Sequence, residues 1–222
     1  MIQAILFDFD GTLSKRYESA YRMYRRMIHG MLPTLDEDSM DFEAIVQRCM
    51  YWDEYGTVHK SYVVDNIEKN YAPDIDTDEW VKYWYAHFHE CQIHMPGSLE
   101  ALEKLQKRYR LGLVTNGNGE SQMSKVKALN LEHFFEFSIA SGDFGKHKPD
   151  PEIFLYAADQ MRLKPDQIAF VGDTFATDIL GAYKAGMLPV WFSYEKRTVS
   201  DMDVIQVTNF KEVEQFFLEN DR

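Results

Sequence analysis

The 222-residue sequence has only two cysteines, Cys49 and Cys91, and they lack the spacing of metal ligands. Two cysteines are too few for a disulfide-rich secreted scaffold, so we expect both to be reduced thiols. Long apolar runs are also missing, since no segment approaches the roughly 18 residues that a membrane-spanning helix needs. The chain begins directly on a strand-like run, without a basic stretch and a cleavage site. These absences predict a cytoplasmic protein that has no membrane partner.

Basic residues are scarce relative to acidic ones. The chain has 24 Lys+Arg against 36 Asp+Glu, a formal net charge of -12. A nucleic-acid polymer is therefore not an expected partner, because the phosphate backbone is bound mainly through positive charge. Hydrophobic residues make up 45% of the sequence and aromatic residues 14%, which is enough for a packed core. The length allows one large domain, or a core that carries a substantial insertion.

Short apolar runs alternate with helical patterns over most of the chain. The runs cover residues 2–8, 111–115, 168–172 and 188–192, with weaker ones at 137–140 and 204–207. Helical patterns cover residues 98–108, 121–129, 150–161, 175–185 and 210–219. Strands that alternate with helices predict an α/β fold, in which a parallel sheet is covered by helices on both faces.

Residues 15–95 depart from this alternation. Tyr17, Tyr21, Tyr24 and Ile28 have the spacing of an amphipathic helix, and further helical stretches follow at 42–50, 59–70 and 78–90. An insert of about 80 residues is too long for a loop. We therefore expect a helical domain at 15–95, inserted into a core domain formed by 1–14 and 96–222.

Polar side chains follow the predicted strands where these end. Asp8 and Asp10 follow the first strand, and Thr115 and Asn116 end the second. The other candidates are Lys148, which follows the run at 137–140, and Asp173 with Asp178, which follow the run at 168–172. In open α/β sheets ligands bind outside the carboxyl ends of the strands, so these side chains are expected to converge.

Such a cluster has the chemistry of a phosphoryl-transfer site. Neighbouring carboxylates repel one another, and Mg²⁺ prefers oxygen ligands together with a substrate phosphate. Asp8 is a candidate nucleophile, because carboxylates can form aspartyl-phosphate intermediates. Asp10 could protonate the leaving oxygen and later deprotonate the hydrolytic water. Thr115 and Lys148 could donate to the phosphoryl oxygens.

Each motif also has a structural interpretation when it is taken alone. Asp8 and Asp10 could belong to a turn, and Thr115 to Gly117 to another. Asp173 and Asp178 could cap the helix that follows them. Lys148 could be an exposed loop residue held extended by the next proline. The four motifs together, each at a predicted strand end, favour a site.

As a set, the motifs resemble the four signature motifs of the haloacid dehalogenase (HAD) superfamily. They are DFDGTL at 8–13, VTNG at 114–117, KPDPEIF at 148–154, and VGDT at 171–174 followed by Asp178. The resemblance implies a Rossmann-like three-layer α/β/α core with a parallel sheet, and an inserted α-helical cap domain. It also implies that Asp8 is the nucleophile and Asp10 the general acid/base. Thr115, Asn116 and Lys148 would bind the phosphoryl group.

The same resemblance implies a Mg²⁺ site formed by Asp8, the main-chain carbonyl of Asp10, and Asp173. Asp178 would assist directly, through water, or by orienting Lys148. A dehalogenase releases halide and needs no acid at the second position, so Asp10 favours phosphate chemistry. Lys146 lies close to Lys148, and the sequence leaves open which of the two lysines reaches the phosphate; Lys148 is preferred because it directly precedes the proline.

The expected function is therefore a Mg²⁺-dependent phosphatase that acts on a small phosphorylated metabolite as a monomer or homodimer. Nucleotides and sugar phosphates are the candidate substrates. A phosphomutase, a phosphonatase with a Schiff-base lysine such as Lys60 or Lys69, and a non-catalytic binding protein are the alternatives. The aromatic turn at 50–56 could stack on a planar substrate or only pack the cap.

Overall fold

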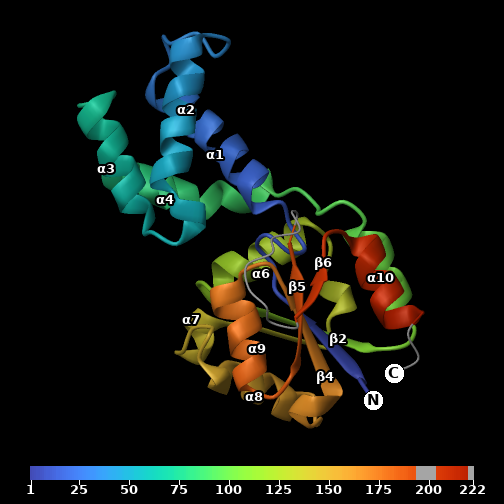
Figure 1. Ribbon diagram of the computed structural model, residues 1–222. Helices are drawn as coiled ribbons and strands as arrows, with labels where there is room; N and C mark the ends of the chain where they lie inside the picture. The colour runs from blue at the N-terminus through green and yellow to red at the C-terminus, as the bar shows by residue number, and fades with distance from the viewer. Residues whose placement is uncertain (194–203, 220–222) are drawn as a thin grey trace. The chain divides into compact units, whose positions relative to one another are not determined.

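A computed structural model describes residues 1–193 and 204–219 of the chain. It contains a parallel six-stranded sheet with the strand order β3-β2-β1-β4-β5-β6 (Figure 1). The strands are β1 (Ala4–Phe7), β2 (Arg110–Thr115), β3 (Phe137–Ala140), β4 (Ile168–Gly172), β5 (Leu188–Phe192) and β6 (Ile205–Val207). The predicted parallel α/β fold is thus confirmed, and the first strand ends one residue earlier than the run 2–8 suggested.

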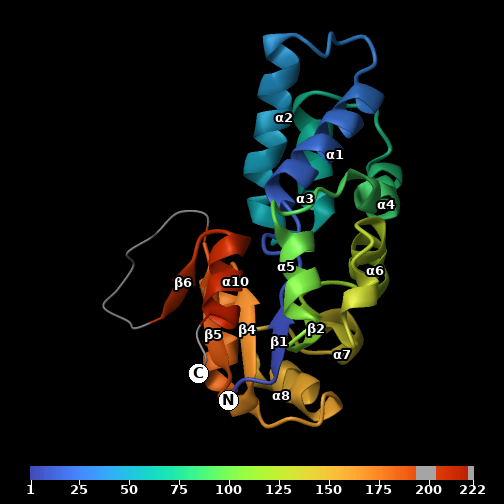
Figure 2. The same cartoon turned by 90° about the vertical axis from the view of Figure 1, so that its right-hand side faces the viewer.

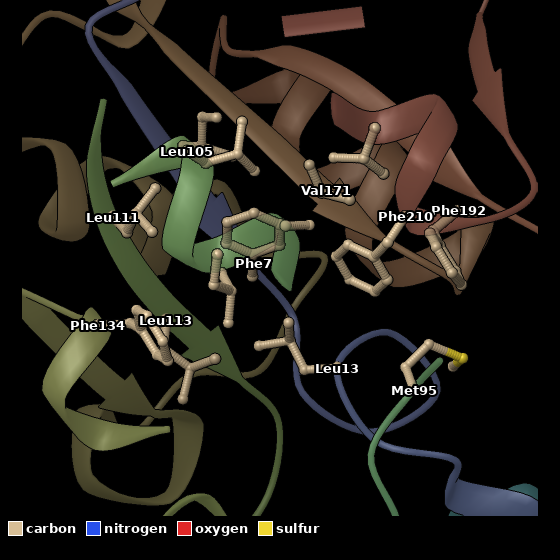
Figure 3. Close-up of a cluster of buried hydrophobic side chains, with 14 of the residues drawn as sticks. Phe7, Leu13, Met95, Leu105, Leu111, Leu113, Phe134, Val171, Phe192 and Phe210 are labelled. Atoms are coloured by element: carbon tan, nitrogen blue, oxygen red, sulfur yellow. The ribbon is translucent and has the colours of Figure 1, made fainter. Parts of the chain in front are cut away.

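Helices cover both faces of the sheet. Helices α5 (Ser98–Leu105), α6 (Gly119–Ala128) and α10 (Phe210–Leu218) pack on one face, and α8 (Pro151–Gln160) and α9 (Leu180–Lys184) on the other (Figures 1 and 2). Successive residues of a strand point to opposite faces. Ile5 and Phe7 accordingly enter the core between the sheet and helices α5, α6 and α10, shown in Figure 3. Ala4 and Leu6 enter the core between the sheet and helices α8 and α9. A central strand buried on both faces explains the continuous apolar run at the start of the chain.

A separate helical unit consists of four main helices. They are α1 (Arg16–Met31), α2 (Met40–Trp52), α3 (Lys60–Asn70) and α4 (Thr77–His87). Their apolar faces form a core of their own, which includes Tyr24, Phe42 and Trp84. Cys49 and Cys91 are buried in this core as free thiols.

The chain divides into two compact units. One consists of Met1–Lys15 with His94–Arg222, and the other of Arg16–Ile93. The predicted bounds, at 14/15 and 95/96, lie one and two residues away from these divisions. Of the predicted core domain, residues 194–203 and 220–222 lie outside the described part of the chain.

Several short elements were not predicted. They are α7 (Ser141–Phe144), η1 (Glu54–Gly56), η2 (Phe88–Cys91), η3 (Glu132–Phe134), η4 (Pro165–Gln167) and the π-helical turn η5 (Phe175–Ile179). The predicted helix at 175–185 thus begins as a π-helical turn before it continues as α9. Turns of this kind occur often at functional sites, and η5 contains Asp178.

A buried ion cluster links three segments of the helical unit. Asp53, which follows α2, pairs with Arg16 of α1 at 2.9 Å and with Lys60 of α3. The Tyr24 hydroxyl donates to the same carboxylate at 2.7 Å. Only 1% of the Asp53 side chain is exposed. Burial alone would raise the pKa of Asp53, but the charges of Arg16 and Lys60 outweigh it and lower the pKa.

The aromatic turn at 50–56 contains two kinds of side chain. Trp52 is partly buried against the core of the helical unit, and its ring centroid lies 6.3 Å from that of Tyr71. Tyr51 and Tyr55 are 80% and 85% exposed. Trp52 therefore packs the unit, and stacking on a ligand stays a prediction for the two tyrosines alone.

Candidate active site

The carboxyl ends of β1, β2 and β4 place the candidate catalytic residues at one edge of the sheet. β1 lies between the other two strands, and Phe7 aligns with Leu113 of β2 and Val171 of β4. The chain continues the ladder for one more step, because the Asp8 amide donates to the Val171 carbonyl at 2.9 Å. Asp8 therefore leaves the sheet between the residues that end β2 and those that follow β4.

Lys148 lies between two of the predicted carboxylates. Its ammonium is 2.6 Å from Asp8 Oδ1 and 2.7 Å from Asp178 Oδ1, and it also donates to the Val114 carbonyl at 2.9 Å. Its side chain is only 2% exposed. Lys146 instead pairs with Glu152 and is 44% exposed. Of the two lysines that the sequence offered, Lys148 is the one that contacts Asp8.

Asn116 joins the end of β2 to the segment that carries Lys148. Its side-chain amide accepts from the Lys148 backbone N–H at 2.8 Å and donates to the Lys148 carbonyl at 3.1 Å. The two bonds fix the Lys148 backbone beside the loop that follows Thr115. Asn116 was predicted from sequence to bind substrate, and in the structure its side chain contacts the main chain of Lys148.

The cluster of acids shifts the pKa values of its members. Burial, opposed by Lys148 and reinforced by the negative charge of Asp178, raises the pKa of Asp8 to about 7. Burial and the charges of Asp8 and Asp178 raise the pKa of Asp173 well above its usual range. Burial would lower the pKa of Lys148, but the neighbouring Asp178 and Asp8 outweigh it and raise the pKa. The acids are therefore short of positive charge despite the buried lysine.

Three of these acids can offer ligands to a single metal ion. One carboxylate oxygen from each of Asp8, Asp173 and Asp178 lies within 4.8 Å of the others. Oxygen ligands of this kind suit Mg²⁺. Three carboxylates here meet one lysine, Lys148, and the excess of two negative charges equals the charge of one divalent cation. The donor set therefore fits the ion that the sequence predicts.

Asp10 has a cationic and an amide partner that were not predicted from the sequence. Lys125 of α6 forms an ion pair with Asp10 Oδ2, and Gln122 of the same helix donates to this oxygen at 3.2 Å. The Thr115 hydroxyl donates to the Gln122 side-chain carbonyl at 3.2 Å. Mg²⁺ and Lys148 were the only positive partners of the acids expected from the sequence, and Lys125 adds a third. The spacing i, i+3 on a helix that follows Thr115 was the available signal.

Two glycines make room for the acids. Gly11 has a φ of +88°, and a Cβ there would collide with the Asp173 carboxylate. A Cβ on Gly172 would lie 2.5 Å from the Cβ of Asp178. Gly11 is therefore needed for its backbone conformation and for the close approach of Asp173.

A comparison with protein families decides the assignment. Residues 5–192 match the model of the haloacid dehalogenase-like hydrolases. The chain belongs to this family. The predicted HAD-like phosphohydrolase is thus confirmed, and the roles of its individual residues remain predictions. No helix within residues 1–193 and 204–219 is long and apolar enough to cross a membrane.

Curated relatives of this HAD-like chain include phosphatases. A glyceraldehyde 3-phosphate phosphatase of Pyrococcus furiosus is 31% identical over 94% of this chain and 88% of its own length. The pyrimidine 5'-nucleotidase YjjG of Escherichia coli is 25% identical, with 87% of each chain covered. Among solved structures, the HAD-hydrolase YfnB of Bacillus subtilis bound to magnesium has a TM-score of 0.78 at 21% identity, and covers 97% of this chain and 98% of its own. This last similarity supports the HAD-like fold.

The raised pKa of Asp8 predicts how Mg²⁺ and pH together affect the thermal stability of this HAD-like chain. A carboxyl group with a raised folded-state pKa stabilises the fold fully below its unfolded value of about 4, and that stability is lost as the pH rises toward about 7. Metal-free protein should therefore be less stable at pH 8 than at pH 5, and Mg²⁺ should raise the melting temperature more at pH 8. Thermal denaturation in EDTA and in millimolar Mg²⁺ measures both effects.

The control for this experiment is Asp173→Asn, which removes one proposed ligand. The variant should lose most of the Mg²⁺-dependent stabilisation at pH 8. If Mg²⁺ raised the melting temperature of the native protein equally at pH 5 and pH 8, protons and Mg²⁺ would not compete for Asp8, and the prediction would be wrong.

Proposed function

We propose that the protein is a Mg²⁺-dependent phosphatase that hydrolyses a small phosphomonoester through an aspartyl phosphate on Asp8. The observation that carries the proposal is the buried contact of Lys148 with Asp8, next to a triad of carboxylates that suits a divalent cation. A carboxylate nucleophile must meet a phosphoryl group that is itself negative. Positive charge at this position makes that encounter favourable.

The first proposed step transfers the phosphoryl group to the enzyme. An oxygen of Asp8 attacks phosphorus while the bond from phosphorus to the leaving oxygen breaks, and Asp10 gives its proton to that oxygen. Lys148 and Thr115 donate to the phosphoryl oxygens in place of their contacts with Asp8 and Gln122. Asp8, Asp173, Asp178 and the Asp10 carbonyl would hold Mg²⁺, which would supply positive charge at the phosphoryl group.

The second step hydrolyses the phosphoenzyme. A water molecule gives one proton to Asp10 and its oxygen attacks phosphorus, and the bond between phosphorus and Asp8 breaks. Inorganic phosphate leaves, and Asp8 and Asp10 return to their starting forms. Asn116, which we propose as part of the phosphate-binding set, acts in this scheme through the Lys148 backbone that it holds.

The substrate that we propose is a short sugar phosphate or a nucleotide. The names of the two curated phosphatases above point to these two classes, and the larger share of identity is with the enzyme that acts on glyceraldehyde 3-phosphate. We further propose that the helical unit, Arg16–Ile93, serves as the cap that selects the leaving group. Tyr51 and Tyr55 are the exposed rings in its aromatic turn that could contact a nucleoside.

The structure offers an argument against one alternative, the phosphonatase. A Schiff-base lysine must react as a neutral amine. Lys60, one of the two lysines considered for that role, forms a buried ion pair with Asp53, which favours the charged ammonium. Its position is therefore suited to holding the helical unit together.

The experiment that tests the function is a turnover assay with a panel of about a hundred phosphorylated metabolites and p-nitrophenyl phosphate. We expect release of inorganic phosphate in Mg²⁺ and none in EDTA, with kcat/KM highest for sugar phosphates or nucleotides. Isomerisation without phosphate release would identify a phosphomutase instead. Turnover that persists in EDTA would overturn the metal assignment.

A further inference from the structure

A buried lysine and a buried glutamine hold the carboxylate of Asp10. Lys125 is 3% exposed and Gln122 7% exposed, and both lie on the face of α6 that is turned toward the sheet. Both side chains contact the same oxygen, Oδ2 of Asp10. The ammonium of Lys125 also lies 5.3 Å from the centroid of the Phe9 ring.

A lysine in this position is costly for the fold. Removing an ammonium from water costs several kcal/mol, and a buried ion pair seldom stabilises a protein more than apolar side chains of similar volume would. The neighbouring Val126, and Leu129 just after the end of α6, pack apolar side chains against the core. The presence of Lys125 among them indicates a role other than packing.

Gln122 is held in one orientation by hydrogen bonds at both ends of its side-chain amide. Its amide group donates to Asp10 Oδ2, and its carbonyl accepts from the Thr115 hydroxyl, so that each end of the amide has a matching partner. A Cβ on Gly117 would lie 2.7 Å from Gln122 Nε2, and the glycine therefore leaves the space that the amide occupies. Gln122 thus connects the end of β2 with the segment after β1.

We propose that Lys125 and Gln122 are positioning residues, which hold Asp10 by Oδ2 so that its other oxygen carries the proton that the leaving group receives. This inference rests on the proposed function, since it takes Asp10 as the general acid. Proton transfer needs heavy atoms within about 2.6–3.2 Å, so a carboxylate that can rotate freely would lose much of its effect. The ion pair and the amide bond together restrict that rotation.

The test is the dependence of kcat/KM on the leaving group. p-Nitrophenolate leaves without being protonated, whereas the alkoxide of glycerol 2-phosphate needs a proton. For Lys125→Met we expect kcat/KM to fall about 100-fold with glycerol 2-phosphate and no more than about threefold with p-nitrophenyl phosphate. An equal loss with both substrates, or no loss with either, would overturn the proposal.

The matched control is Lys127→Met. Lys127 lies on the same helix and is exposed, so its replacement should leave both rates and the melting temperature unchanged. Gln122→Met is a second test, which keeps every charge in place and should show the same preference for p-nitrophenyl phosphate to a smaller degree. Lys125→Arg, which restores a cation at this position, should recover part of the activity with glycerol 2-phosphate.

Asp10→Asn separates a failure of this proposal from a failure of the proposed function. If Asp10→Asn discriminates between the two leaving groups but Lys125→Met and Gln122→Met do not, the positioning role is wrong and the general acid stands. If Asp10→Asn also fails to discriminate, Asp10 is not the general acid, and both the proposal and that part of the mechanism are wrong.

Discussion

Replacing Asp8 with asparagine is expected to reduce phosphatase turnover on the order of 10⁴- to 10⁶-fold, a loss of the size seen when other enzymes lose their nucleophile. The amide of asparagine has no anionic oxygen to attack phosphorus. The replacement is nearly isosteric, and it removes one of the charges that burial and Asp178 make unfavourable. Steady-state assays with p-nitrophenyl phosphate in Mg²⁺ measure the effect.

Two further observations make this result specific. The native protein, mixed with substrate and quenched in acid, should carry one phosphoryl group on the peptide that contains Asp8, and Asp8→Asn should carry none. Glu152→Gln is the control, because Glu152 is exposed and pairs with Lys146 away from Asp8. Full activity of Asp8→Asn, or a beryllium fluoride adduct on another residue, would show that the nucleophile lies elsewhere.

Replacing Asp53 with asparagine should destabilise the helical unit by about 3–5 kcal/mol, because Arg16 and Lys60 then lie buried without a counter-charge. Urea unfolding followed by hydrogen exchange in α1 and α3 measures the loss. Asp65→Asn, at an exposed position of α3, should change the stability by less than about 0.5 kcal/mol. A loss no larger than that of the control would mean that the ion cluster contributes little.

The stability lost in Asp53→Asn should depend on pH in a defined direction. The folded-state pKa of Asp53 is lowered, so its stabilising effect is fully present above the unfolded value of about 4 and is lost as the pH falls through the folded value. The difference in the free energy of unfolding between the native protein and Asp53→Asn should therefore be constant from pH 5 to pH 7 and should become smaller below pH 4.

Most of the sheet could be predicted because its strands are buried on both faces. Such strands have continuous apolar runs. The edge strands β3 and β6 are partly exposed and each contains a polar residue, which is why their runs were weaker. The ends of helices were less well predicted: α6 is capped by Asn118 and begins at Gly119, two residues before the predicted helix at 121–129. The π-helical turn that contains Asp178 has no signal in the periodicity of the sequence, because it depends on local hydrogen bonding to Thr174.

The sequence predicted the positions of those site residues that directly follow neighbouring strands of the sheet. Asp8 and Asp173 follow adjacent strands, and the rule for strand ends was sufficient to place them side by side. Lys125 was missed because the pattern of a helix indicates which of its faces is apolar, and a lysine on that face appears only as an exception. Which residue it contacts depends on how α6 packs on the sheet.

The Asp53 cluster could not be predicted for a related reason. Its members come from α1, the turn after α2, and α3, and the helical pattern does not fix how these helices are arranged. Charged residues in amphipathic helices are usually exposed. Three of them in one buried cluster become apparent only when the helices are packed together.

The two hydrogen bonds between the Asn116 side chain and the Lys148 backbone make the position of Lys148 independent of the length of the segment that precedes it. The segment 144–146 can change in length or composition, and Lys148 will still meet Asp8 as long as Asn116 binds the N–H and the carbonyl of Lys148. No atom lies within 4 Å of the place that a Cβ on Gly145 would occupy. A deletion or insertion near Gly145 should therefore change the local stability far more than the position of Lys148 relative to Asp8. Segment length and catalytic geometry can thus diverge independently in this part of the molecule.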